Sequence, residues 1–259
     1  MKNNLRLITI TPKEAKKLLE LNVNNRRVKP DRVRIYAEEM KHNRWQINGE
    51  CIKISEGNII LDGQHRLLAC VAADVSFVTY IMTELPDSIM PTIDQGVART
   101  PSDIMGLYGI KNSTGVAATI KKYIWIKSGL SNVERKVSVA ILLEEYNKRP
   151  DFWQSVFSFS RSISTANNGV ILMTSIGAYY AWLLEYGDAG LFFELMVSSD
   201  KTPSNVFIKY MTRAKLTKRK VNQSEFHYLI IKSFNAFKSG KEISLLSLRP
   251  NETMPELIK

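Results

Sequence analysis

The sequence of 259 residues contains only two cysteines, Cys51 and Cys70, and only three histidines. Two isolated cysteines cannot build a disulfide framework. Neither belongs to a Cys-x-x-Cys pair, which argues against redox and zinc sites. Because no His-x₃-His spacing is present either, a zinc hydrolase is not expected.

Long apolar runs are also missing. No uninterrupted apolar stretch approaches the ~20 residues that a membrane helix requires, and Met1–Asn4 lacks the apolar region of a signal peptide. We therefore expect a cytoplasmic protein. The sequence has no Gly-x₄-Gly-Lys loop and no Gly-x-Gly-x-x-Gly fingerprint, which excludes two common nucleotide-binding loops.

Positive charge is abundant. Lys and Arg number 36 against 25 Asp and Glu, so the net charge is +11 and the isoelectric point is near 9.6. Such an excess favours a polyanionic partner, and we expect double-stranded DNA. The alternative for each charge run is a solvated surface that binds nothing. Two clusters are the expected contacts: Arg26, Arg27, Lys29, Arg32 and Arg34, and then Lys209, Arg213, Lys215, Lys218, Arg219 and Lys220.

The chain divides into two patterns, which predict an α+β fold. Residues 1–99 alternate between strand-like and helix-like segments, with strands expected at 7–10, 51–54, 58–61 and 77–82. Residues 100–259 have helical periodicity almost throughout. We predict seven or eight helices there, near 101–108, 114–127, 138–147, 151–163, 170–186, 189–198, 203–217 and 224–238.

The segment 59–66 (IILDGQHR) is the strongest candidate site. A strand ends at Asp62, Gly63 permits a tight turn, and a helix begins at Gln64. The first N–H groups of a helix form an anion site, which the helix dipole reinforces. His65 and Arg66 could add donors to phosphate oxygens, and Asp62 could hold a divalent metal. The plainer alternative is a helix start in which Asp62 is only the N-cap and Arg66 makes a surface ion pair.

The motif Asp-Gly-Gln-His-Arg at residues 62–66, preceded by a basic helix–loop–helix and a hairpin, resembles the ParB/sulfiredoxin superfamily. The resemblance implies a small mixed sheet-and-helix domain at 1–99, followed by an all-helical domain at 100–259. In partition proteins of this superfamily the matching turn cradles a nucleoside triphosphate. In sulfiredoxins a cysteine of this turn attacks, but Gln64 stands in its place here, which argues against sulfiredoxin activity.

The resemblance extends to other residues. Arg26 or Arg27 matches an arginine of a second phosphate-contacting box in partition proteins. A later Asp-x-Gly…Arg segment, with Asp94, Gly96 and Arg99, is typical of the ParB-like nucleases of phages and mobile elements. Asp94 and Arg99 would suit a metal–phosphate site, whereas an ordinary loop with a solvated arginine is the alternative.

These features lead to three hypotheses. The leading one is a metal-assisted DNA endonuclease or nickase, in which Asp62 and Asp94 hold Mg²⁺ or Mn²⁺ and His65 is the general acid or base. Arg66 and Arg99 would stabilise the developing phosphorane. The second is an enzyme that binds ATP or CTP, such as a kinase acting on a nucleotide or a modified base, with the phosphates at Gly63, Gln64, His65 and Arg66. The third is a non-enzymatic, partition-like DNA-binding protein.

Overall fold

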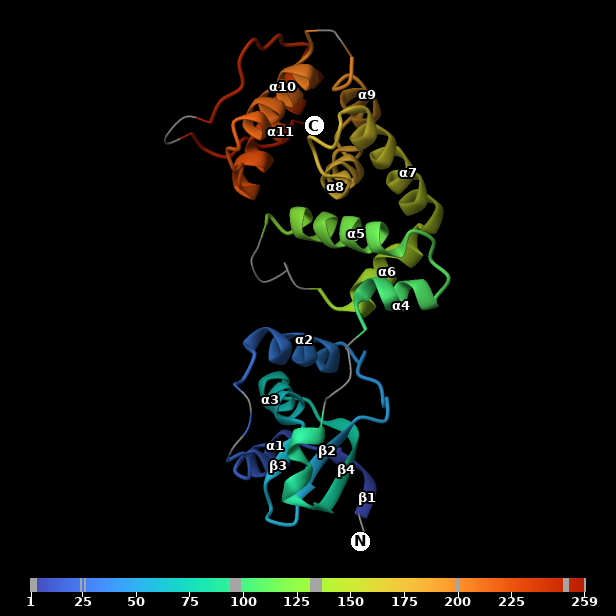
Figure 1. The fold of residues 1–259 in the computed structure, drawn as a ribbon, viewed down its shortest axis with the longest axis vertical. Helices are drawn as coiled ribbons and strands as arrows, with labels where there is room; N and C mark the ends of the chain where they lie inside the picture. The colour runs from blue at the N-terminus through green and yellow to red at the C-terminus, as the bar shows by residue number, and fades with distance from the viewer. Residues whose placement is uncertain are drawn as a thin grey trace. The chain divides into compact units, whose positions relative to one another are not determined.

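The computed structural model describes residues 4–23, 25, 27–93, 99–130, 137–198, 201–248 and 252–258. The chain forms two compact units, Met1–Ala98 and Arg99–Lys259 (Figure 1). The first is a mixed α/β unit and the second is entirely helical in its described residues. None of the helices in the described part of the chain has the length and apolar character needed to cross a membrane.

The α/β unit is built on a four-stranded mixed sheet with the order β1-β4-β2-β3. Strand β1 pairs antiparallel with β4, β4 pairs parallel with β2, and β2 forms an antiparallel hairpin with β3. In chain order the elements are β1 Asn4–Ile10, α1 Pro12–Leu19, α2 Pro30–Lys41, β2 Cys51–Ser55, β3 Ile60–Asp62, α3 Gln64–Ala73, β4 Phe77–Leu85 and the 3₁₀ helix η1 Asp87–Thr92. The four strands predicted from the sequence are confirmed, with β1 and β4 longer than expected.

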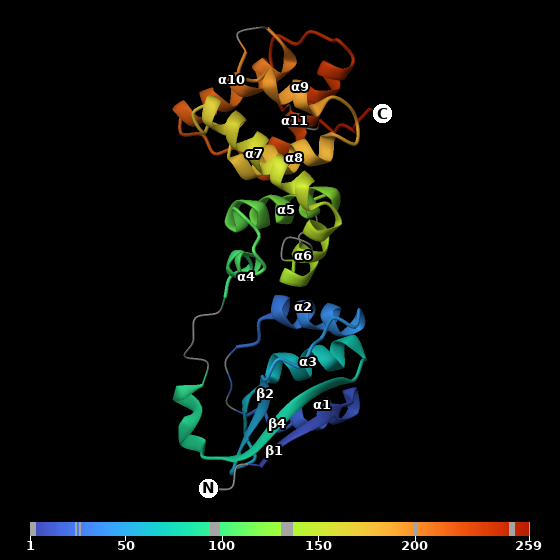
Figure 2. The same ribbon diagram turned by 90° about the vertical axis from the view of Figure 1, so that its right-hand side faces the viewer.

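Helices α1, α2 and α3 lie on one side of this sheet, where α1 and α2 both pack against α3 (Figure 2). Their shared core contains Ile10, Ile52 and Phe77 from the strands and Leu67 from α3. A capping box of the sequence pattern Thr-Pro-Lys-Glu opens α1: the Thr11 hydroxyl accepts from the N–H of Glu14, whose carboxylate accepts from the N–H of Thr11. This packing fixes the start of α3 against the end of the β2–β3 hairpin.

The helical unit contains all eight predicted helices. They are α4 Pro101–Leu107, α5 Ser113–Lys127, α6 Val139–Lys148, α7 Pro150–Ala166, α8 Met173–Leu183, α9 Ala189–Glu194, α10 Pro203–Leu216 and α11 Gln223–Lys238. Helix α11 is buried along almost its whole length and lies in one large apolar cluster with α5, α7 and α8. Tyr179 on α8 belongs to this core and is fully buried.

Candidate functional site

The predicted turn between strand and helix is present. Strand β3 ends at Asp62, Gly63 has a positive φ of 108°, and α3 begins at Gln64. The backbone conformation favours glycine, and a Cβ on Gly63 would lie 2.3 Å from the Cδ1 atom of Ile52, so that this buried side chain would have to shift. The N-cap of α3 is Gly63 and not Asp62, and no side chain caps this helix. The alternative in which Asp62 is only the N-cap is therefore wrong.

Asp62 is held by two cations. Its Oδ2 atom accepts from Nζ of Lys53 at 3.1 Å and from Nη2 of Arg66 at 2.9 Å. Burial alone would raise the pKa of Asp62, but the charge of Arg66 and the hydrogen bond from Lys53 outweigh it and hold the pKa below its usual value. The carboxylate is therefore ionised at neutral pH, and its charge is already compensated.

Arg66 lies inside the unit. Its side chain donates to the backbone carbonyl of Cys51 at 2.9 Å as well as to Asp62, and the residue is 7% exposed. The alternative of a surface ion pair is therefore wrong, because this pair is buried. The Nη1 atom is also buried and has no hydrogen-bond partner among the described residues.

Gln64 and His65 hold the loop between α1 and α2. The Gln64 amide accepts from Asn22 at 3.3 Å and donates to Asn25 at 3.2 Å. Nε2 of His65 accepts from the backbone N–H of Lys29 at 3.0 Å. The two motif residues are only 2% and 4% exposed. Because the Nε2 lone pair of His65 is occupied by a backbone N–H, it is not open to take up a proton from a substrate in this arrangement.

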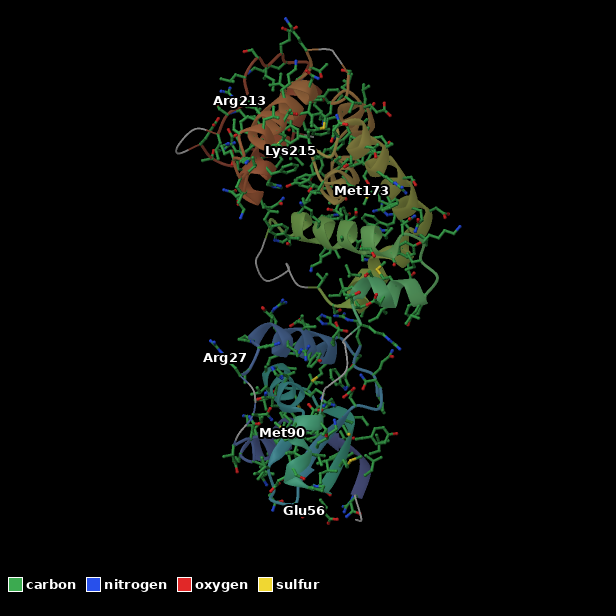
Figure 3. The ribbon with its side chains drawn as sticks, viewed as in Figure 1. Arg27, Glu56, Met90, Met173, Arg213 and Lys215 are labelled. Atoms are coloured by element: carbon green, nitrogen blue, oxygen red, sulfur yellow. The ribbon has the colours of Figure 1, made fainter. Side chains whose placement is uncertain are left out.

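The loop that these side chains hold is basic. Arg27, Lys29 and Arg32 are exposed at the start of α2, and Arg34 is half-buried. Figure 3 shows Arg27 at the outer edge of the α/β unit. Arg26 lies outside the described residues. The motif thus positions the basic loop through the hydrogen bonds of Gln64 and His65. The sequence alone did not reveal this role of the motif. Asn22, Asn25 and Lys53 are partners that sequence reasoning missed, and two amides in a short loop were the available signal.

Only part of the predicted metal site, Asp62, falls within the described residues. Asp94, like Gly96, lies outside the described residues, and Arg99 is exposed at the start of the helical unit. No group of three or more His, Cys, Asp or Glu side chains comes together among residues that the structure describes. For Asp62 to bind Mg²⁺ or Mn²⁺, the ion would have to compete with Lys53 and Arg66.

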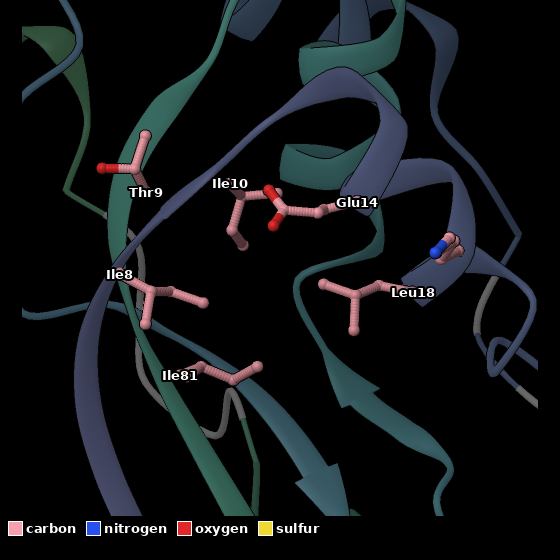
Figure 4. A pocket seen from close by; sticks show the side chains of 7 residues that line it. Ile8, Thr9, Ile10, Glu14, Leu18 and Ile81 are labelled. Atoms are coloured by element: carbon pink, nitrogen blue, oxygen red, sulfur yellow. The ribbon is translucent and has the colours of Figure 1, made fainter.

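The α/β unit also has a hollow of about 430 Å³ between α1 and the edge of the sheet (Figure 4). Its walls are mainly the apolar side chains of Ile8, Leu18 and Ile81, with Glu14 and Lys17 at α1. Glu14 is already engaged in the capping box. None of the motif residues lines this hollow, so it is separate from the turn at Gly63.

The second basic cluster surrounds the end of α10. We define the α10 cluster as Lys209, Arg213, Lys215, Lys218, Arg219 and Lys220, all of which are exposed. Two members have partners within the unit. Nζ of Lys215 donates to the carbonyls of Asn168 and Gly169, and Arg219 forms an ion pair with Glu225 at 2.8 Å. Figure 3 labels Arg213 and Lys215 on this helix.

Comparisons with models of protein families, with curated proteins and with solved structures gave no match for this chain. The likeness to the ParB/sulfiredoxin superfamily therefore rests on the residues of the motif itself.

Proposed function

We propose that this protein binds double-stranded DNA and that its helical unit supplies most of the contacts. The distribution of charge carries this proposal. Residues 99–259 contain 22 Lys and Arg against 13 Asp and Glu, a net charge of +9, whereas residues 1–98 contain 14 against 12, a net charge of +2. The excess positive charge of the whole chain thus belongs almost entirely to the helical unit.

The α10 cluster concentrates this charge. No acidic residue occurs between Lys209 and Lys220. Four of its six cations, Lys209, Arg213, Lys218 and Lys220, have no ion-pair or side-chain hydrogen-bond partner among the described residues. Unpaired surface cations of this density bind a DNA backbone by releasing its condensed counterions, without reading base sequence.

The experiment compares two variants with the same change in net charge. The test variant replaces Lys209, Arg213, Lys218 and Lys220 with glutamine. The control variant replaces four exposed lysines elsewhere in the helical unit, which are Lys111, Lys121, Lys201 and Lys241.

Fluorescence anisotropy with a labelled duplex measures both dissociation constants. Several phosphate contacts shift affinity by orders of magnitude, so we expect the test variant to bind at least ~10-fold more weakly than the control. Equal affinities would contradict the proposal.

A ParB/sulfiredoxin-like role for the α/β unit is the second part of the proposal. The strand, glycine and helix of residues 60–73 support it, and so does the basic loop held by Gln64 and His65. In this role the turn binds a phosphate group. One observation favours it: Nη1 of Arg66 is buried without an acceptor, and a buried guanidinium nitrogen is stabilised when an anion oxygen reaches it.

Phosphoryl chemistry at this turn is therefore our second candidate function, either as NTP binding or as metal-assisted DNA cleavage. Titration calorimetry with ATP or CTP tests the first, and nicking of supercoiled plasmid with Mg²⁺ or Mn²⁺ tests the second. Arg66→Lys keeps the charge but replaces the guanidinium, with its Nη1 donor, by a single ammonium group. We expect this variant to lose nucleotide binding while its unfolding temperature stays within a few degrees of wild type. If the plasmid stays intact and calorimetry detects no heat of nucleotide binding, this second candidate function is contradicted and only the proposed DNA binding remains.

A further inference from the structure

An exposed leucine stands inside the α10 cluster. Leu216 is the last residue of α10 and is 79% exposed, the largest exposed fraction among the large apolar side chains that the structure describes. It is also the one exposed large apolar residue of that helix. Single exposed leucines are common on protein surfaces, but this one stands among the six cations of the α10 cluster.

The turn that carries Leu216 is closed by a dense set of hydrogen bonds. The N–H of Arg219 donates to the carbonyl of Ala214 at 2.9 Å, and the N–H of Lys218 donates to that of Lys215 at 3.1 Å. The Thr217 hydroxyl donates back to the carbonyl of Arg213 at 2.9 Å. This pattern is a Schellman-type helix end, in which the left-handed position is usually glycine. Here Lys218 occupies it with a φ of 53°, so a cation stands where glycine is favoured.

Side chains anchor the same turn on both sides of Leu216. Lys215 donates to two carbonyls of the turn after α7, at Asn168 and Gly169. On the other side, the guanidinium of Arg219 lies over the ring of Tyr210 and pairs with Glu225. The backbone around Leu216 is thus fixed, while the leucine itself and Lys218 and Lys220 face solvent.

We propose that Leu216 is a wedge that inserts between two base pairs of duplex DNA while Lys218, Lys220 and Arg213 contact the flanking phosphates. Proteins that bend DNA insert a single apolar side chain in this way and compensate the lost stacking with additional backbone contacts. The inference rests on the proposed DNA binding and adds a deformation of the duplex to it.

A DNA partner fits this surface better than a lipid surface does. An interfacial membrane helix needs a broad apolar face beside its cations, whereas the residues next to Leu216 are Lys215, Thr217 and Lys218, all exposed. One apolar side chain on a fixed turn matches the narrow gap of a single base step. The cations around it suit a polyanionic backbone.

The test uses the full chain and an AT-rich duplex. Permanganate oxidises thymines that are unstacked, so it detects the wedge wherever the protein binds. Wild-type protein should raise thymine oxidation, and Leu216→Ala should abolish the increase and weaken binding ~10–100-fold, as expected for one buried leucine. Its salt dependence should equal that of wild type because no charge is lost. Leu216→Phe should retain the oxidation, and Leu245→Ala, at a leucine 75% exposed outside the cluster, should behave as wild type.

The outcomes separate the two proposals. If wild-type protein does not bind the duplex at all, the proposed DNA binding fails. If wild type binds but Leu216→Ala matches it in both affinity and thymine oxidation, the wedge is overturned while DNA binding stands. If Leu216→Ala instead reduces binding to vesicles of anionic phospholipid and leaves DNA binding unchanged, the turn is a membrane contact and the wedge is also overturned.

Discussion

Replacement of Gly63 by alanine tests how the candidate site is built. The structure gives two separate reasons why this change is unfavourable. First, a φ of 108° is a conformation that L-residues rarely adopt. Holding a residue with a Cβ in the left-handed region costs ~1–2 kcal/mol. Second, the new Cβ would lie 2.3 Å from Cδ1 of Ile52, and overpacking of this kind costs about 1–3 kcal/mol. Gly63→Ala should therefore destabilise the α/β unit by ~2–5 kcal/mol.

Ile52→Val separates the two contributions because it removes Cδ1, the atom that clashes. Alone it should cost ~0.5–1.5 kcal/mol, as other Ile→Val changes in cores do. In the double variant the clash is gone and only the backbone strain and the lost methyl remain. The two substitutions should thus couple favourably by ~1–3 kcal/mol, in the range of residues in direct contact.

The assay needs a probe confined to the α/β unit. Of the four tryptophans only Trp45 belongs to residues 1–98, where its ring packs against Tyr36 and Phe77. Its ¹⁹F resonance in fluorotryptophan-labelled full-length protein therefore follows urea unfolding of that unit alone. Strict additivity of the two substitutions, or a cost below ~1 kcal/mol for Gly63→Ala, would refute this account of the turn.

Three further predictions concern buried charges. Asp62→Ala leaves the guanidinium of Arg66 buried without its carboxylate partner. The free energy of unfolding followed at Trp45 should therefore decrease by ~3–5 kcal/mol, whereas Lys53→Met should decrease it far less. Burial lowers the pKa of His227 to about 4, so as the pH falls the unfolded chain takes up this proton before the folded chain does. The free energy of unfolding of the helical unit should therefore decrease by ~2 kcal/mol between pH 7 and pH 5. His227→Phe should make this free energy nearly independent of pH in that range. Burial also lowers the pKa of Lys122 to about 8, so between pH 8 and 10.5 the unfolded chain binds more protons than the folded chain. The free energy of unfolding should therefore rise with pH over this range. Lys122→Met should raise the free energy of unfolding at pH 7 by ~1–2 kcal/mol.

Local rules were enough to predict most of the fold. Two capping boxes, at Thr11 and at Thr100, mark helix starts that the structure contains. The period of apolar residues located the eight helices of the second unit, because each buries one stripe in a shared core. The turn at Gly63 was predictable since a glycine between a β-branched strand and an apolar helix has few other uses.

The orientation of the motif side chains was not predictable from local pattern. Gln64 and His65 are buried because the loop after α1 covers them. This loop lies about forty positions earlier in the chain. Arg66 is buried because β3, which leads into α3, pairs with β2 and so brings the carbonyl of Cys51 within its reach. Neither contact has a short-range signal in the sequence, so the motif looked like a set of exposed phosphate donors.

The salt dependence of duplex binding tests the central claim, DNA binding through the α10 cluster, most directly. Each lost phosphate contact should reduce the slope of log affinity against log salt by about 0.9. The variant that lacks Lys209, Arg213, Lys218 and Lys220 should therefore have a slope shallower than that of the charge-matched control by about 3–4. A slope equal to the control's would show that these cations do not contact DNA and would contradict the account.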